Sequence, residues 1–274
     1  MTTLSELAAS RELFANLTLR ELRGKYKRST LGWTWSPVNP LATMAIFTVV
    51  FNFFLKIEPE PGDPSGLQVF AFFLLCGLLP WNYLSNSFTG SMGMLLSNAN
   101  LIKKVYFPRE ILIAANVAAA GVALVIEMAV LCVVLLIAGN FVLPWLIPLV
   151  AVIALQTMFV TGVGLTFSVL NVYFRDVQHF VGILLQLWFY ATPIVYPPRF
   201  VPGTHTILGV ELPVRTIYNL NPMVQFVKAY RNLIYDLRFP SLGTVTFLVG
   251  VSVASLVIGR AVFGRFEPRL AEEL

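Results

Sequence analysis

Six apolar runs constrain this chain most, because each is close to the roughly 20 residues that an α-helix needs to cross a bilayer core. Hydrophobic residues make up 57% of the 274 and charged residues 12%, so the chain carries more apolar surface than one soluble core can bury. The sequence therefore predicts an all-α polytopic membrane protein with a single transmembrane domain over 1–274. We place the six spans at about 37–56, 67–90, 111–138, 145–171, 177–197 and 240–263.

The stretch before the first span is typical of a membrane entrance. Four basic residues fall within 23–28, and Trp33 and Trp35 follow them. Cations are held at an anionic cytoplasmic surface, and indole rings settle at the headgroup level. With the N-terminus inside, thirteen Lys and Arg residues lie on the cytoplasmic side and six outside. We therefore expect both termini, including the tail at 264–274, in the cytoplasm, and we expect the positive charge to meet lipid headgroups rather than nucleic acid.

Residues 2–27 have the pattern of one amphipathic helix. Thr3 and Glu6 stand in capping-box spacing at its start, and Arg20 and Arg23 recur beside a leucine stripe. This pattern favours a helix that lies in the membrane interface over one that crosses it. A merely solvated helix is the alternative, because the stripe is narrow. We expect the first thirty residues to form a cytoplasmic interface segment.

The segment 97–110, between the second and third predicted spans, is the sharpest cytoplasmic feature. Asn98 and Asn100 are suited to cap a short helix, and Lys103 and Lys104 give that helix a basic side. Such a helix either binds a partner protein or docks on the membrane surface, and the local pattern does not distinguish the two possibilities.

A second cytoplasmic connection, 171–179, is short enough to be only a turn. Arg175 and Asp176 lie within it. We expect these two side chains to form a capping interaction or an ion pair.

The long external connection, 198–239, is not a plain loop. Asn221 and Pro222 suit an N-cap and the first position of a helix, and apolar residues follow at helical spacing, while Lys228 and Arg231 share another face. Segments too short or too broken to span re-enter the membrane or lie on its outer leaflet. We expect this connection to shape an external mouth.

Enzyme signatures are absent from the sequence, which has no phosphate-binding loop and no GxSxG or HExxH motif. ATP hydrolysis, if the protein depends on it, must come from another chain. Cys76 and Cys132 fall inside apolar runs, and we expect neither a disulfide nor a metal site. Glu127 is the one carboxylate near the middle of a predicted span. Its two possible roles are proton coupling and the fixing of helix packing as a protonated or hydrogen-bonded side chain.

Aromatic residues are dense in the first, second and fifth predicted spans. Their faces suit the C–H side of a sugar ring, whereas an interfacial belt or contact with lipid is the ordinary role of such side chains. The sequence alone leaves both interpretations open.

Five motifs resemble the permease subunits of bacterial ABC exporters for lipid-linked polysaccharides, a family that moves O-antigens, teichoic acids and related cell-envelope glycans. The motifs occur in order over nearly the whole chain. Related permeases of GC-rich actinobacteria export cell-wall galactan, and the excess of arginine over lysine here is typical of a GC-rich genome. The motifs are LGWTWSPVNPL at 31–41, NANLIKKVYFPRE at 98–110, YFRDV at 173–177, YATPIVYP at 190–197 and NPM at 221–223.

The resemblance implies a homodimeric pore in the bacterial cytoplasmic membrane. Two copies of this chain would pair with two copies of a separate ATP-binding subunit, which binds ATP and Mg, so that this chain holds no cofactor. The substrate would be a polysaccharide linked to a polyprenyl carrier, and membrane lipids would be the other partners.

The resemblance also implies roles for individual residues. ATPase coupling is expected from Asn98, Asn100, Lys103, Lys104, Phe107, Pro108, Arg109, Glu110, Arg175 and Asp176. Contact with the carrier pyrophosphate, or with ordinary anionic lipids, is expected from Arg20, Arg23, Arg28, Trp33 and Trp35. The channel candidates are Phe51, Phe54, Trp81, Tyr83, Tyr190 and Tyr196. The external gate candidates are Asn221, Pro222, Phe226, Tyr230 and Arg231.

Three alternatives remain open at this point. A permease that exports drugs or small lipids shares the topology, but would have a closed substrate pocket instead of a continuous channel. A proton-coupled carrier would depend on Glu127 and need no ATPase. A membrane-embedded glycosyltransferase or polyprenyl-phosphate enzyme would need ionisable residues gathered at one membrane face, and Glu58, Glu60 and Asp63 come nearest to that.

Overall fold

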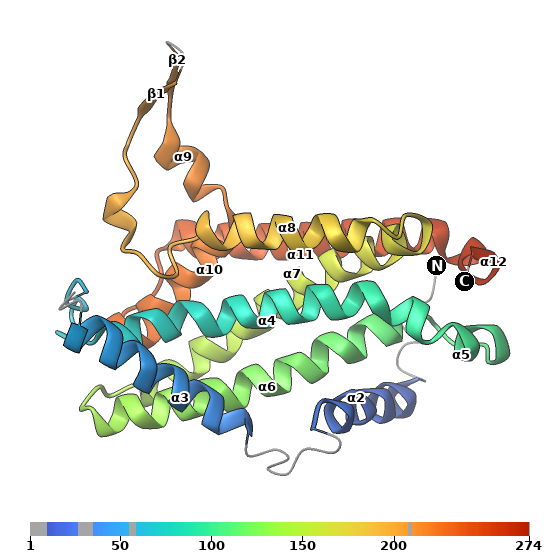
Figure 1. The fold of residues 1–274 in the computed structure, drawn as a ribbon, viewed down its shortest axis with the longest axis horizontal. Coiled ribbons are helices and arrows are strands. Elements are labelled where there is room, and N and C mark those ends of the chain that lie inside the picture. Colours follow the sequence, from blue (N-terminus) through green and yellow to red (C-terminus); the bar gives the residue numbers. More distant parts are fainter. Residues whose placement is uncertain (1–9, 27–34, 55–58, 208–209, 274) are drawn as a thin grey trace.

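The computed structural model describes residues 10–26, 35–54, 59–207 and 210–273. They form an elongated bundle of helices from which one arm projects (Figure 1). The longer helices are α2 (Arg11–Tyr26), α3 (Trp35–Thr48), α4 (Phe70–Ser97), α6 (Glu110–Ile137), α7 (Leu146–Tyr173), α8 (Val177–Tyr190), α10 (Pro222–Arg231) and α11 (Leu242–Phe266). The shorter helical elements are η2 (Val49–Phe54), α5 (Ala99–Lys104), η3 (Leu143–Trp145), η4 (Pro198–Phe200), α9 (Val214–Asn219), η5 (Asn232–Asp236), η6 (Glu267–Arg269) and α12 (Leu270–Glu273).

Apart from these helices, the described residues contain one short antiparallel hairpin. Strand β1 (His205–Ile207) pairs with β2 (Val210–Leu212), with His205 opposite Leu212. The hairpin stands at the tip of the projecting arm, while α5 and α12 lie together at one end of the bundle (Figure 1). We call that end the α5 end and the opposite one the arm end.

Among the described residues, three helical stretches are long and apolar enough to cross a membrane, namely Glu110–Ile137, Leu143–Tyr173 and Leu242–Arg269. Two shorter apolar helices are Val38–Phe51 and Val177–Tyr190. Large apolar side chains on the outer faces of the long helices stay exposed, as expected for surfaces that contact lipid rather than protein.

The helix in the fifth apolar run is shorter than its run. The run covers 177–197, but the helix ends at Tyr190 and turns follow. Pro193 disfavours helical geometry in the residue before it, and Pro197 and Pro198 keep the chain from resuming the helix at once. The length of an apolar run therefore overestimated the length of this helix.

The central helix of the bundle is α4, which contacts α3, α6, α7, α8 and α10. Much of its length is buried. Between α4 and α6, the side-chain amide of Asn116 donates to the carbonyl of Ser87 and to Oγ of Ser91, both at 3.1 Å. This polar bridge joins two apolar helices in the way expected inside a membrane, where side-chain hydrogen bonds help hold helices together.

Two glycines set the close crossing of α7 and α11. A Cβ atom on Gly162 would lie 2.2 Å from the backbone of Ser255, and one on Gly259 would lie 2.2 Å from the carbonyl oxygen of Gly162. The hydroxyl of Ser255 also donates to the carbonyl of Phe159 at 2.8 Å. Small residues at a helix crossing let the two backbones approach closely enough to gain van der Waals contact.

The N-terminal amphipathic pattern appears as α2, which packs beside α6. Leu17 and Leu22 are buried, whereas Arg20 and Arg23 lie on the exposed side. The capping-box pair at positions 3 and 6 lies outside the described residues.

Candidate functional site

The α5 end carries an exposed basic and apolar surface made by residues 103–106. Lys103 and Lys104 are exposed, and the side chain of Tyr106 is fully exposed. Ile102 and Phe107 point the other way and are buried. The sequence interpretation placed Phe107 on the coupling surface, but the structure places it in the core. The sequence interpretation did not single out Tyr106, whose only signal was an aromatic residue between the basic pair Lys103 and Lys104 and the helix-breaking Pro108.

Asn98 does not cap α5, contrary to the sequence interpretation. Its side-chain amide donates to the carbonyl of Met94 at 2.9 Å, in the last turn of α4. The carbonyls at a helix C-terminus have no partner in the helix, so a side-chain donor that follows α4 directly is drawn back to them. Asn100 lies exposed within α5.

Arg20 joins α2 to this region. Its Nη2 atom donates to Oδ1 of Asn98 at 2.9 Å and to Oε1 of Glu21 at 2.8 Å. Arg23 and Trp35 are exposed, and Arg28 and Trp33 lie outside the described residues. The structure therefore brings together one residue expected at the lipid interface and one expected to couple to the ATPase.

The junction between α5 and α6 is tied to the end of α11. The guanidinium of Arg109 donates to the backbone carbonyl of Glu267, and Nε of Arg260 lies 3.3 Å from Oε2 of Glu110. Pro108 and Arg109 are half-buried and Glu110 is buried. Sequence reasoning missed Arg260 and Glu267, because nothing local to 97–110 points to them.

The turn between α7 and α8 differs from its prediction. Arg175 and Asp176 are both exposed. Within the described part of the chain they form no ion pair with each other, and the side chain of Asp176 does not cap α8. Backbone groups complete the turn, since the carbonyl of Asp176 accepts from the amides of His179 and Phe180 at 3.1 Å.

At the arm end, Asn221 caps α10 as its sequence position predicted. Its Oδ1 accepts from the amide of Met223 at 3.0 Å, and Pro222 takes the first helical position. The same oxygen accepts from Nε1 of Trp188 at 2.7 Å, and the side-chain amide donates to the carbonyl of Ala191 at 3.1 Å. One asparagine therefore fixes the start of α10 to the end of α8.

The helix α10 is inserted among α4, α7 and α11 and does not lie on the surface. Phe226 and Tyr230 are fully buried. The hydroxyl of Tyr230 donates to Oε1 of Gln156 at 2.8 Å, and Nε2 of Gln156 donates to the carbonyl of Pro80 at 2.8 Å. This buried chain of hydrogen bonds joins α10, α7 and α4, which is the arrangement expected of a re-entrant segment.

Arg231 is the most unusual charged residue of the arm end, because its side chain is 6% exposed. Its guanidinium donates to the carbonyls of Phe73 at 3.2 Å, Pro193 at 2.5 Å and Ile194 at 2.9 Å. It also stacks over the ring of Phe73 at 3.5 Å. Burial lowers the pKa of Arg231 to about 10, so the side chain keeps its charge near neutral pH.

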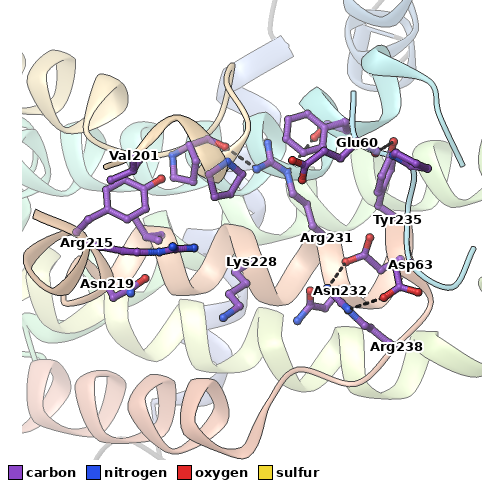
Figure 2. Close-up of a pocket in the computed structure, with 17 residues that line it drawn as sticks. Glu60, Asp63, Val201, Arg215, Asn219, Lys228, Arg231, Asn232, Tyr235 and Arg238 are labelled. Carbon is purple, nitrogen blue, oxygen red and sulfur yellow. Dashed lines mark hydrogen bonds and ion pairs between the residues drawn. The ribbon is translucent and has the colours of Figure 1, made fainter. Parts of the chain in front are cut away.

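Beside Arg231 lies a cavity of about 380 Å³, shown with its lining side chains in Figure 2. The cavity is lined by the 60–63 turn, the 193–201 segment, α9, α10 and η5. Arg238 lies 3.3 Å from the carboxylates of both Asp63 and Asp236, and Arg199 lies 3.2 Å from Glu60. The acidic groups of the lining therefore all have a basic partner.

The predicted channel aromatics separate into buried and exposed residues. Trp81 and Tyr83 are 5% and 3% exposed, Phe54 and Tyr190 are exposed, and Phe51 is half-buried. The ring of Phe51 stacks on that of Phe70 at 3.9 Å, and the hydroxyl of Tyr196 donates to the carbonyl of Tyr190 at 2.8 Å.

An open groove of about 400 Å³ runs between α4 and α8. Trp81, Ser85 and Thr89 line it from α4, and Gln186 and Tyr190 line it from α8. The three α4 residues are spaced by four, which places them on one face of the helix. Sequence reasoning named the two aromatics as channel candidates and Gln186 as a polar residue within a span, but it missed the two hydroxyls. Glu127 lies elsewhere, half-buried on α6.

Comparison with known proteins shows which family this chain is similar to. The family model for ABC-2 type transporters matches residues 12–235. The O-antigen export system permease protein RfbA of Klebsiella pneumoniae is 30% identical over 96% of this chain and 95% of its own length. The protein of the same name from Myxococcus xanthus is 29% identical over 98% of each chain. The polysialic acid transport protein KpsM of Escherichia coli is 22% identical over 90% of each chain.

Proposed function

The chain belongs to the ABC-2 type transporter family, and on that premise we propose that it is the pore-forming permease of an ATP-driven exporter that moves a polyprenyl-linked cell-envelope polysaccharide out of the cytoplasm. Its six apolar helical segments, α3 with η2, α4, α6, α7, α8 and α11, are the spans. The α5 end faces the cytoplasm and the arm end faces outward, which puts both termini inside. A galactan is one candidate for the glycan.

The groove between α4 and α8 is the observation that carries this proposal. Tyr190 offers an exposed ring beside the largely buried Trp81, and Ser85, Thr89 and Gln186 offer hydrogen-bonding groups between them. Sugars need both kinds of contact, because each ring has an apolar C–H face and a rim of hydroxyls. The groove is open along one side, which favours a wall of a pore over the closed pocket of a drug exporter.

A second copy of this chain would complete the pore. Phe180, Ile183, Leu187 and Tyr190 form an exposed apolar stripe along α8, at the spacing of three and four that marks one helix face. Two such stripes that meet about a two-fold axis would enclose the two grooves.

ATP-driven closure of the two ATPase subunits would act on the exposed surface 103–106. The push would pass through the contacts that Arg109 and Glu110 make with the end of α11, and then through the glycine crossing of α11 with α7. Two arrangements of this contact network, favoured by different nucleotide states, would correspond to different pore widths. Hydrolysis itself belongs to the separate subunit.

The proposal is tested by expression of this chain with an adjacent ATP-binding gene product and purification through a tag on this chain alone. We expect an ATPase of equal stoichiometry to copurify, and polysaccharide to reach the cell surface only when both genes are present. Purification of the chain alone, together with proton-driven uptake that is lost in Glu127→Gln, would instead establish a proton-coupled carrier.

A further inference from the structure

The cavity at the arm end is lined by more basic than acidic side chains. Arg215 on α9 and Lys228 on α10 line it, are exposed, and have no carboxylate within ion-pair distance in the described part of the chain. Lys228 lies between Arg215 and Arg231 in the view of Figure 2. These three side chains form what we call the cationic wall.

Arg231 gives this wall a strong preference for an anion. Each of its three hydrogen bonds goes to a neutral backbone carbonyl. A buried charge is costly unless an opposite charge compensates it, and backbone carbonyls compensate it only through their dipoles. An oxyanion in the adjacent cavity would add a countercharge in direct contact, which the described residues do not supply.

The acidic residues of the cavity do not fill that role, because their charges are already engaged. Glu60 pairs with Arg199, and Asp63 and Asp236 share Arg238. Asp63 lies beside Arg238 on the side of the cavity away from Arg215 (Figure 2). No described carboxylate lies within ion-pair distance of Arg215, Lys228 or Arg231, although Asp236 is near enough to Arg231 to interact with its charge.

The rest of the lining suits a sugar. Tyr218 and Tyr235 contribute aromatic rings, and Asn219 and Asn232 contribute amides that both donate and accept hydrogen bonds. The volume, about 380 Å³, falls in the range of roughly 300–1,000 Å³ that is typical of small-molecule sites.

We propose that this cavity is a binding site for an acidic sugar, in which the cationic wall holds the carboxylate and the tyrosine and asparagine side chains contact the ring. This inference rests on the proposed function, because the site would hold acidic units of the exported glycan as they leave the pore. The binding step itself requires no transport.

The test measures binding of glucuronic acid oligosaccharides, with glucose oligosaccharides of equal length as the neutral comparison. The permease is purified with its ATP-binding subunit in phosphatidylcholine nanodiscs, and affinity is read by calorimetry. We expect the acidic oligosaccharide to bind at least tenfold more tightly than the neutral one. Lys228→Gln and Arg215→Gln should each weaken acidic binding by about tenfold, the effect of one charge-assisted contact. Both side chains are exposed, so these variants should fold even if a change at Arg231 prevents folding.

Arg265→Gln is the matched control, because Arg265 is an exposed arginine at the end of α11, far along the chain from the cavity. Equal affinity for the two sugars, or an equal loss in the Arg265→Gln variant, would overturn the proposal. Full competition by nanodiscs that contain phosphatidylglycerol would identify a lipid-headgroup site instead. A wild-type complex that exports glycan but binds no acidic sugar refutes the acidic-sugar site alone, whereas binding without any export refutes only the proposed function.

Discussion

The Nη2 atom of Arg20 donates a 2.9 Å hydrogen bond to Oδ1 of Asn98, which joins α2 to the start of α5. The two residues are 78 positions apart in the sequence. The same asparagine is bonded to Met94 at the end of α4. This hydrogen bond therefore connects α2 with the segment that carries the exposed surface 103–106.

Arg20→Ala should lower export per ATP hydrolysed by several-fold, with little effect on the free energy of unfolding. The bond is exposed, and exposed charged pairs contribute at most about 1 kcal/mol. Arg11→Ala is the control, since Arg11 is exposed on the same helix. Export and ATPase rates measured side by side in proteoliposomes check this, and equal effects of the two substitutions would contradict it.

Tyr106→Ala and Phe107→Ala should separate docking from folding. Tyr106 is fully exposed, so its removal should weaken ATPase association about tenfold without lowering the melting temperature. Phe107 is buried, and truncation should cost about 3 kcal/mol of folding free energy. Pull-down of the ATPase and thermal unfolding in detergent distinguish the two. A stable Phe107→Ala protein that has lost the ATPase would reverse the assignment.

Tyr106 and Phe107 show which features of the structure follow from the sequence and which do not. The apolar runs predicted where the long helices lie, because the length and composition of a segment decide whether it can sit in lipid. The family resemblance carried by the five motifs is also confirmed. Local patterns failed where a distant contact prevailed, as at Asn98, which bonds Arg20 and the end of α4 and does not cap α5. The split between Tyr106 and Phe107, and the burial of Arg231, likewise depend on helices that are remote in the sequence.

Gly162→Ala should destabilise the crossing of α7 and α11. The added Cβ would lie 2.2 Å from the backbone of Ser255, which cannot rotate away. Overpacking of this kind costs about 1–3 kcal/mol. Gly250→Ala is the matched control, because a Cβ there meets nothing within 4 Å. The melting temperatures of the two variants, measured in the same detergent, should differ clearly, and equal values would show that the helices can move apart without cost.

Tyr230→Phe should cost about 1–3 kcal/mol of folding free energy, since it leaves the buried oxygen of Gln156 without its donor. The ring and its packing are preserved, so the loss reports the hydroxyl alone. The double variant Tyr230→Phe with Gln156→Met removes both partners and should recover part of the loss, although the carbonyl of Pro80 then loses a donor as well. Denaturant titration of the three proteins gives the comparison, and an unchanged midpoint for Tyr230→Phe would exclude a stabilising role for this bond.

Asp236→Asn should become relatively more stable than the wild type as pH rises. Burial raises the pKa of Asp236 above its ordinary value, although Arg238 opposes the rise. Because the folded pKa lies above the unfolded one, the folded state binds the proton more tightly, so wild-type stability falls as pH rises through the interval between the two values. Asparagine does not titrate and carries no such penalty, although it weakens the pair with Arg238 by a constant amount at higher pH. Melting temperatures recorded from about pH 4 to about pH 7 should therefore show the difference between the variant and the wild type shift toward the variant. A shift toward the wild type would mean that the pair with Arg238 outweighs burial at this carboxylate.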